Sequence, residues 1–314
     1  MKEDAPSATA NVVARNVLLV ASTKKLSHLV APSAARLSGR FIQAFSPQGE
    51  AFLRRVGRTP FQSLFRFYER ITIPGLALHQ ALRKKHIERV VRASLAEGFN
   101  QVVVLGGGLD SLALRLHGEF PRVNFLELDH PATQRVKREV IEAHRLAGDN
   151  LKLLAVDFTE QALEDCLAAS QNYLPGAKTL FICEGVLMYL EAGEVDEIFA
   201  FIRRQPGALK RFVFTFMEPD ESGKTNFRNS TWLVRLWLSW RKEPFKWGVS
   251  REEVGNFLAA RGFSVKELAT PETFRDLYLR NPDLSGLTLA EGENVCVCDS
   301  EKASEPARRD AEVD

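Results

Sequence analysis

The sequence of 314 residues has little cysteine, and its four cysteines do not form a metal-binding pattern. Cys166, Cys183, Cys296 and Cys298 lack the paired spacing of a structural zinc site. We interpret them as reduced thiols in the core of a cytoplasmic protein. The Cys296-x-Cys298 pair leaves open a redox or metal role as the alternative.

The sequence also lacks a large net charge, and we see no targeting segment and no membrane span in it. The formal charge is +2, which implies no nucleic acid partner. Residues 1–10 are polar with early acidic groups, unlike a secretory leader. The apolar stretch 12–21 contains Arg15 and Asn16 and is too short to cross a bilayer. We expect no membrane span and a cytoplasmic location. Residues 299–314 are charged and almost free of large apolar groups, so we expect a disordered tail.

A strand and a glycine turn stand at the centre of the sequence. Residues 102–105, all apolar, predict a buried strand, and three glycines from Gly106 to Gly108 follow directly. The next residues carry apolar groups at helical spacing. Strand, glycine turn and helix open a nucleotide-binding βαβ unit, where a side chain would keep the backbone away from the ligand. The third glycine of the nicotinamide fingerprint is missing, because Ser111 occupies its place.

Acidic residues end several of the predicted strands. Residues 123–129 read as a second buried strand that ends in Asp129, at the spacing where a carboxylate binds ribose hydroxyls. Glycine turn and acidic strand end suit adenosylmethionine as well as a dinucleotide. Strands at 151–156 and 179–183 end beside Asp157 and Glu184. Since ligands of parallel sheets bind at the carboxyl ends of strands, Gly106 and these three acids should lie together.

Four motifs in order carry a resemblance to a known family. LGGGLDS, LELDHP, VDF and EGVLMYL together resemble the leucine carboxyl methyltransferases, a branch of the class I S-adenosylmethionine-dependent methyltransferases that includes bacterial small-molecule O-methyltransferases. The resemblance runs from about Leu82 to about Leu268. It implies an α/β fold with a Rossmann-like, mostly parallel sheet, a C-terminal antiparallel hairpin and an N-terminal helical arm.

The expected organisation is one catalytic domain with appendages. We predict a helical arm or lid over residues 1–74, the S-adenosylmethionine-binding domain over 75–298 and the tail over 299–314. Within the arm, Thr59-Pro60 predicts the start of a helix that carries several aromatic residues. We interpret Phe61, Phe65 and Phe67 mainly as core residues.

The resemblance also assigns the cofactor site residue by residue. Gly106 and Gly108 would form the turn, and Asp129 would lie at the ribose. His130 is adjacent to that site, although a histidine at a helix start more often caps the helix or packs. Asp157 and Phe158 match the adenine-contacting pair, and Glu184 the acid beside the cofactor. Arg83 falls where an arginine binds the methionine carboxylate, with Lys84 or Lys85 as alternatives of register.

The acceptor is the part that the sequence leaves open. Tyr189 could face the substrate as a catalytic residue, and it could equally be an ordinary half-buried tyrosine. The aromatic stretch 232–240 favours a small, fairly apolar acceptor that is methylated on a hydroxyl or a carboxyl. The alternatives are carboxyl methylation of a protein C-terminus, a nicotinamide oxidoreductase, and a non-catalytic binding protein of this fold. The oligomeric state is open, and no metal site is legible.

Overall fold

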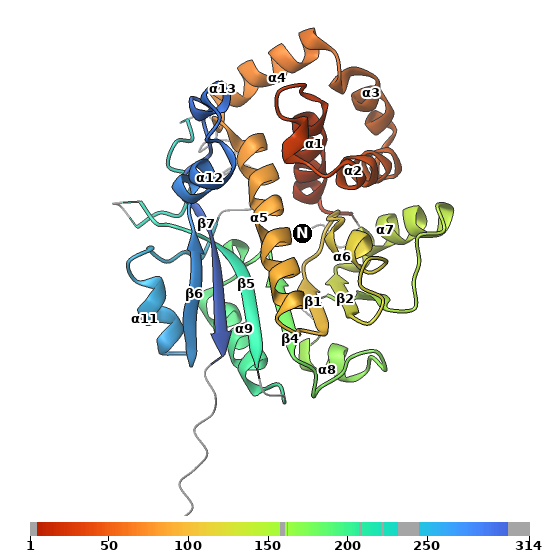
Figure 1. Ribbon diagram of the computed structural model, residues 1–314, viewed down its shortest axis with the longest axis vertical. Coiled ribbons are helices and arrows are strands. Elements are labelled where there is room, and N and C mark those ends of the chain that lie inside the picture. The colour runs from red at the N-terminus through yellow and green to blue at the C-terminus, as the bar shows by residue number, and fades with distance from the viewer. Residues whose placement is uncertain are drawn as a thin grey trace, which may run out of the picture.

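A seven-stranded sheet in the order β3-β2-β1-β4-β5-β7-β6 forms the centre of the protein (Figure 1). The structure is a computed structural model and describes residues 5–157, 161, 163–206, 209–220, 223–231 and 245–300. The strands are β1 Gln101–Leu105, β2 Asn124–Asp129, β3 Leu151–Ala155, β4 Thr179–Cys183, β5 Lys210–Met217, β6 Phe263–Ala269 and β7 Glu293–Ser300. The first five pair in parallel, and β7 is antiparallel to both β5 and β6. The predicted fold class is therefore confirmed.

The C-terminal strands differ in detail from a simple hairpin. The connection from β6 to β7 contains α12 Pro271–Tyr278 and α13 Pro282–Ser285, so the pair is antiparallel without a tight turn. Strand β7 also continues two residues into the predicted tail. Arg211 donates to both carboxylate oxygens of Asp299 over 2.7 and 2.9 Å, which fixes this end of the strand on β5. Residues 301–314 lie outside the described part of the chain.

Five helices precede the sheet; the first four lie in the upper part of Figure 1, and the fifth runs down along the sheet. They are α1 Ala8–Ser22, α2 Pro32–Phe45, α3 Pro47–Val56, α4 Thr59–Ile71 and α5 Leu76–Ala96, with a short 3-10 turn at Ser27–Leu29. Prolines stand in the first turns of α2, α3 and α4, where their missing N–H costs nothing. Ser7 caps α1 by accepting the N–H of Ala10 over 3.1 Å.

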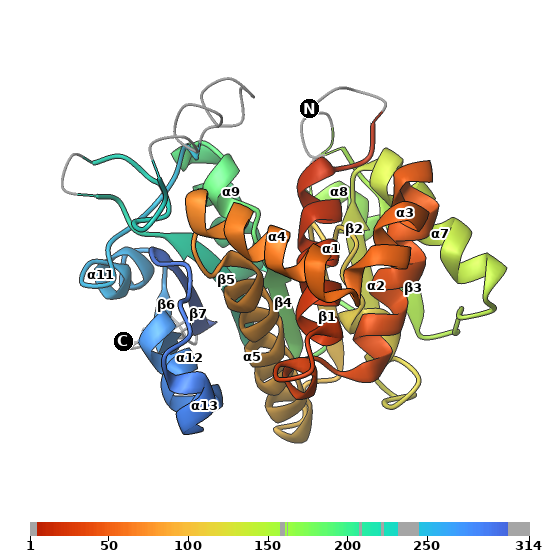
Figure 2. The same ribbon diagram turned by 90° about the horizontal axis from the view of Figure 1, so that it is seen from above.

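Helices cover both faces of the sheet, and Figure 2 shows the two layers from above. The remaining helices are α6 Leu112–Leu116, α7 Pro131–Ala143, α8 Leu163–Ala168, α9 Ala192–Arg204 and α11 Val254–Ala259. Alternate strand residues point to opposite faces. Val102 and Val104 join the core under α1, α2, α5 and α7, whereas Val103 and Leu105 join the core under α8, α9 and α11.

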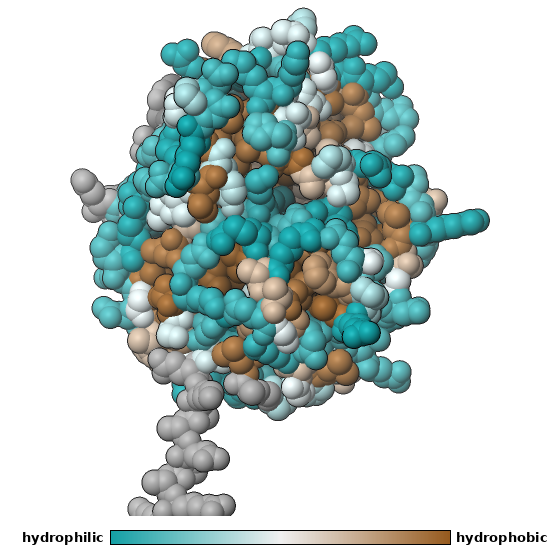
Figure 3. All heavy atoms as spheres, in the orientation of Figure 1, coloured by the Kyte–Doolittle hydropathy of each residue, from teal (hydrophilic) through white to brown (hydrophobic). Residues whose placement is uncertain are grey.

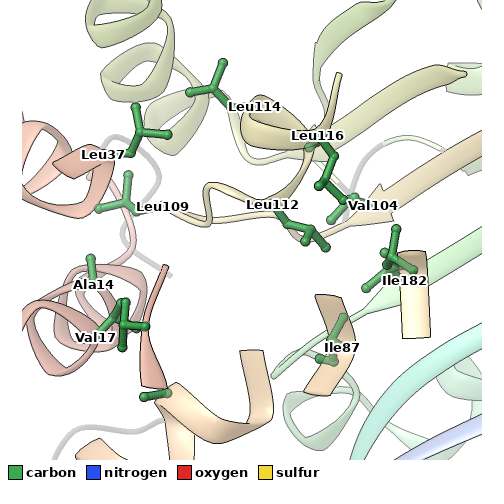
Figure 4. Packing of buried hydrophobic residues seen from close by; sticks show 14 of the residues in the cluster. Ala14, Val17, Leu37, Ile87, Val104, Leu109, Leu112, Leu114, Leu116 and Ile182 are labelled. Carbon is green, nitrogen blue, oxygen red and sulfur yellow. The ribbon is translucent and has the colours of Figure 1, made fainter. Parts of the chain in front are cut away.

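The N-terminal arm shares the first of these cores with the rest of the protein. Figure 4 shows Ala14 and Val17 of α1 and Leu37 of α2 beside Leu109, which follows the glycine turn. All four side chains are at most 7% exposed. The boundary that we predicted after residue 74 therefore divides the sequence but not the hydrophobic core.

Three of the four cysteines lie in the second core as free thiols. Cys183, Cys296 and Cys298 are fully buried, and no disulfide links them. Burial raises the pKa of Cys296 to about 12, so this thiol does not ionise at neutral pH. Because a thiolate is the reactive and metal-binding form, the interpretation as core residues fits better than a redox or metal role.

The face shown in Figure 3 is mostly hydrophilic, with hydrophobic residues in separate patches. None of the described helices is long and apolar enough to cross a membrane.

The aromatic packing around Phe199 gives a test of the second core. The Phe199 ring lies 5.2 to 5.5 Å from the rings of four other phenylalanines, Phe212, Phe214, Phe257 and Phe263. We expect Phe199→Ala to lower the free energy of unfolding by about 3–5 kcal/mol, the usual loss for a buried phenylalanine. Leu277→Ala, at a side chain 48% exposed, should cost well under that. Urea unfolding measures both, and equal losses would contradict this packing.

Candidate functional site

The glycine turn after β1 takes a conformation that requires glycine. Gly106 and Gly108 have φ values of 72° and 53°, in the left-handed region. A Cβ on Gly106 would lie 2.5 Å from Val186 Cγ2, and one on Gly107 would lie 2.5 Å from the Glu127 carboxyl group. The chain past β4 and the side chain on β2 therefore approach the turn as closely as a backbone without side chains permits.

The end of β2 and the end of β3 meet beside this turn. The Asp129 carboxylate accepts the N–H of Gly108 and, over 2.7 Å, the N–H of His130. Burial raises the pKa of Asp129, and these N–H donors oppose that shift. The His130 Nδ1 accepts the Ala132 N–H over 3.3 Å, so its Nε2 carries the proton, and Nε2 lies 3.5 Å from Asp157 Oδ2.

The Arg83 side chain is buried between two carboxylates. It comes from the second turn of α5 and is 6% exposed. Nε donates to Glu184 Oε1 over 2.8 Å, and Nη1 donates to Glu293 Oε2 over 2.7 Å. Glu293 also contacts His79 Nε2 over 3.1 Å. Burial alone would raise the pKa of Glu293, but Arg83 and His79 outweigh it and hold the value at about 2.

Lys84 connects these groups to the glycine turn. Its Nζ lies 3.1 Å from Asp110 Oδ1 and 3.2 Å from Glu184 Oε2. Burial would raise the pKa of Asp110, but Lys84 above all holds it at about 2. The result is an alternating row of charges, which we call the charge chain. It consists of Glu293, Arg83, Glu184, Lys84 and Asp110.

The structure thus places most of the predicted site residues at one edge of the sheet. Arg83, Gly106, Gly108, Asp129, His130, Asp157 and Glu184 lie at or beside the carboxyl ends of β1 to β4. Of the alternatives to Arg83, Lys84 joins the charge chain, and Lys85 does not, because its Nζ reaches the His28 carbonyl over 3.5 Å. Phe158 and the aromatic stretch 232–240 lie outside the described residues.

Two further charged residues were not among the predicted ones. Asp110 stands inside the LGGGLDS motif, so its position was visible although its role was not. Glu293 is 210 residues from Arg83 in sequence and follows no motif. Only the insertion of β7 between β5 and β6 brings it to the site.

An apolar cluster includes residues that follow Glu184 along the chain. Tyr189 belongs to the short turn Leu187–Tyr189, and its ring meets Phe245 edge-on at 5.4 Å between centroids. Phe245 in turn lies 6.0 Å from Phe227. The cluster consists of Ile73, Leu76, Met188, Tyr189, Met217, Phe227, Phe245 and Ala290. It gathers residues from the start of α5, the end of β5 and the segment after β4.

Comparison with known proteins agrees with this geometry. Residues 27–203 match the family model of leucine carboxyl methyltransferase. The chain belongs to the leucine carboxyl methyltransferase family. A protein of Mycobacteroides abscessus named "Putative S-adenosyl-L-methionine-dependent methyltransferase" is 29% identical over 68% of this chain and 72% of its own length. Protein YktD of Bacillus subtilis, named in the same way, is 25% identical over 78% of this chain and 79% of its own.

A solved structure supports the fold. The crystal structure titled as a putative methyltransferase from Thermobifida fusca has a TM-score of 0.56 and 16% identity, and the match covers 84% of this chain and 94% of that one. This protein is accordingly an S-adenosylmethionine-dependent methyltransferase, and S-adenosylmethionine is its cofactor. This settles the alternatives of a nicotinamide oxidoreductase and of a non-catalytic protein.

The residues at the strand ends fit this cofactor in chemistry. Asp129 offers acceptors for a ribose diol, and Asp157 offers one for an exocyclic amine. Arg83 and Lys84 provide cations, and Glu184 an anion, for the two charged groups of an amino acid. The glycine turn has no side chain of its own, so its backbone is bare at the edge where these groups meet.

Glu293 offers a test of the charge chain through pH. Because its pKa is depressed in the folded protein, its stabilisation is present above the ordinary value of 4.5 and is lost as the pH falls toward about 2. Glu293→Gln should lower the free energy of unfolding by about 3–5 kcal/mol at neutral pH, since it leaves Arg83 incompletely paired in the interior. The variant should also lose less further stability between pH 4.5 and 2 than the wild type.

Urea unfolding at several pH values measures both effects. Glu252→Gln changes an exposed glutamate and should keep the wild-type profile. Parallel profiles for wild type and Glu293→Gln would show that Glu293 does not stabilise the protein as a carboxylate.

Proposed function

We propose that this methyltransferase acts on a hydroxyl or carboxyl oxygen of a small, fairly apolar molecule. The observation that supports the proposal is the apolar cluster. It combines the aromatic groups of Tyr189, Phe227 and Phe245 with the thioethers of Met188 and Met217. Small-molecule sites are lined in this way, with a few polar groups that fix orientation, and methionine adapts to irregular apolar shapes.

The cofactor would lie along the edge from β3 to β4. We assign Asp129 to the ribose, with His130 beside it, and Asp157 and Phe158 to the adenine. Arg83 and Lys84 would hold the carboxylate of the methionine part, and Glu184 its amino group. Gly106 and Gly108 would let the backbone approach the cofactor. Ribose hydroxyls would compete with the Gly108 N–H for Asp129, which makes the turn sensitive to cofactor binding.

The N-terminal arm would close over this site. A Cβ on Gly108 would lie 3.1 Å from Ala10 Cβ, so the first turn of α1 already lies against the glycine turn. The Ser7 N–H also donates to Thr133 Oγ1 over 3.1 Å, which holds the start of α1 at the start of α7. These contacts support a covering role for the arm, with its core shared and its first turn next to the cofactor edge.

For methyl transfer, the main task of the protein is to orient the acceptor toward the methyl group. S-adenosylmethionine supplies an electrophilic methyl group on a sulfonium. The protein must align the acceptor oxygen with it and exclude water, and such alignment is worth roughly 7–11 kcal/mol of the barrier. Tyr189 is the hydroxyl that the apolar cluster contains, and we propose that it contacts the acceptor oxygen.

A protein C-terminal carboxylate is the alternative acceptor. The name of the family favours it. The size of the acceptor distinguishes the two proposals, since a C-terminal peptide needs a groove that accepts a chain, and the apolar cluster favours a compact molecule.

Binding of the cofactor is directly testable with Asp129→Ala. Adenosylhomocysteine should raise the melting temperature of the wild type, because a ligand that binds only the native state stabilises it. NAD should not. Removal of the Asp129 carboxylate should weaken adenosylhomocysteine by about 1–3 kcal/mol, the loss expected for a charged hydrogen bond. Titration calorimetry measures the dissociation constants, with exposed Glu252→Ala as the control. Unchanged affinity in Asp129→Ala would place the ribose elsewhere.

The pH dependence of the rate distinguishes a carboxyl from a hydroxyl acceptor. A carboxylate is already ionised at neutral pH, so its rate should stay flat from about pH 6 to 9. A hydroxyl needs a base, and its rate should rise through the pKa of that base. We expect the rising profile, and we expect Tyr189→Phe to lower the rate more than His28→Ala, since His28 is exposed and is not a member of the cluster. A flat profile that Tyr189→Phe leaves unchanged would overturn the hydroxyl assignment.

A further inference from the structure

Helix α4 carries an apolar stripe that the described protein leaves uncovered. Leu64, Phe67, Tyr68 and Ile71 are 66%, 61%, 57% and 38% exposed. Their spacing of three, four and seven residues puts them on one face of the helix. None of the residues of α4 is buried, although its sequence is strongly amphipathic. The interpretation of Phe67 as a core residue is therefore wrong.

The opposite side of α4 is fixed to the protein, so the stripe has a definite outward direction. Phe61 meets the Phe52 ring edge-on at 5.7 Å. Gln62 Nε2 donates to the carbonyls of Ser22 and Val56, both over 3.0 Å. The Glu69 carboxylate accepts the N–H of Ala77 over 2.7 Å. The one acidic side chain of the helix is thus turned inward.

The surroundings of the stripe are strongly basic. Residues 1–74 contain eleven Lys or Arg and four Asp or Glu, a formal charge of +7, whereas the whole chain carries +2. The exposed cations on and beside α4 form no ion pair with any described residue. They are Lys24, Lys25, Arg55, Arg58, Arg66 and Arg70. Arg66 and Arg70 lie along one side of the stripe on the helix itself.

We propose that α4 is an interfacial helix that docks the protein on an anionic lipid surface. An apolar stripe with aromatic and leucine side chains, with arginines beside it, is the arrangement that lies in the headgroup region of a bilayer. Anionic headgroups would neutralise the basic arm. A nucleic acid would use the arginines but would leave the stripe in water. A second copy of the chain would bring two basic arms together, which their charge opposes.

The position of α4 connects this surface to the proposed acceptor site. Directly after α4, Ile73 and Leu76 join the apolar cluster. Thr231, from the segment after Phe227, donates its N–H to the Thr72 carbonyl over 2.9 Å. Its hydroxyl donates to the Ile71 carbonyl over 2.6 Å. Docking would bring the cluster beside the lipid, where apolar acceptors concentrate. The surface itself does not depend on the identity of the acceptor.

Vesicle binding of the full chain tests the proposal without any methyl acceptor. The probes are vesicles of phosphatidylcholine alone and vesicles with equal parts of phosphatidylglycerol, and co-sedimentation gives the bound fraction. We expect binding to the anionic vesicles and a large loss when the salt rises from about 0.1 M to about 0.5 M. Leu64→Ser/Phe67→Ser and Arg66→Gln/Arg70→Gln should each weaken binding about tenfold or more.

Matched variants control for composition. Val265→Ser/Leu277→Ser changes two exposed apolar residues, and Arg122→Gln/Arg280→Gln changes two exposed arginines, all outside the arm. Both should bind like the wild type. Equal binding by the α4 variants would overturn the proposal. Absent vesicle binding by the wild type would overturn it too. In that case, a lower melting temperature of Leu64→Ser/Phe67→Ser would show that the chain itself covers the stripe. A change from dimer to monomer in this variant would show that a second copy covers it.

Discussion

The pairing of buried Arg83 with Glu293 and Glu184 is the interaction on which the site depends. A guanidinium that is 6% exposed must be paired, because an isolated charge in the interior costs far more than a fold can supply. Its two partners come from the segment after β4 and from the start of β7, while Arg83 itself comes from α5. The pairing therefore ties three elements together, and Lys84 extends it to Asp110 at the glycine turn. Folding and the proposed cofactor site are therefore coupled through one row of charges.

The residues of the candidate site that lie within or next to a motif could be predicted from the local sequence. The apolar strands, the glycine turn and the acids Asp129, Asp157 and Glu184 follow from patterns of a few residues, and the mostly parallel sheet with antiparallel C-terminal strands followed from the family resemblance. Glu293 could not be found in this way. It faces Arg83 only because β7 is inserted between β5 and β6, a pairing that joins residues far apart in sequence. Such partners are decided by topology, which no local pattern contains.

The N-terminal arm shows the same limit in another form. The start of one arm helix could be predicted from its Thr59-Pro60 pair, and α4 begins at Thr59. The apolar face of α4 predicted burial, yet Leu64 and Phe67 are exposed. Periodicity tells that a helix has an apolar face. It does not tell whether the rest of the chain covers that face, and α4 has its stripe on the side away from Phe61 and Gln62.

The most direct test of the central claim is a crystal structure of the protein with adenosylhomocysteine. We expect the ribose on Asp129, with the Gly108 contact of that carboxylate given up, and the amino acid part on Arg83, Lys84 and Glu184. We also expect Glu293 to stay paired with Arg83 when the ligand is bound. A ligand bound away from the glycine turn, or an Arg83 that leaves Glu293 to reach it, would contradict the view that the charge chain builds the site.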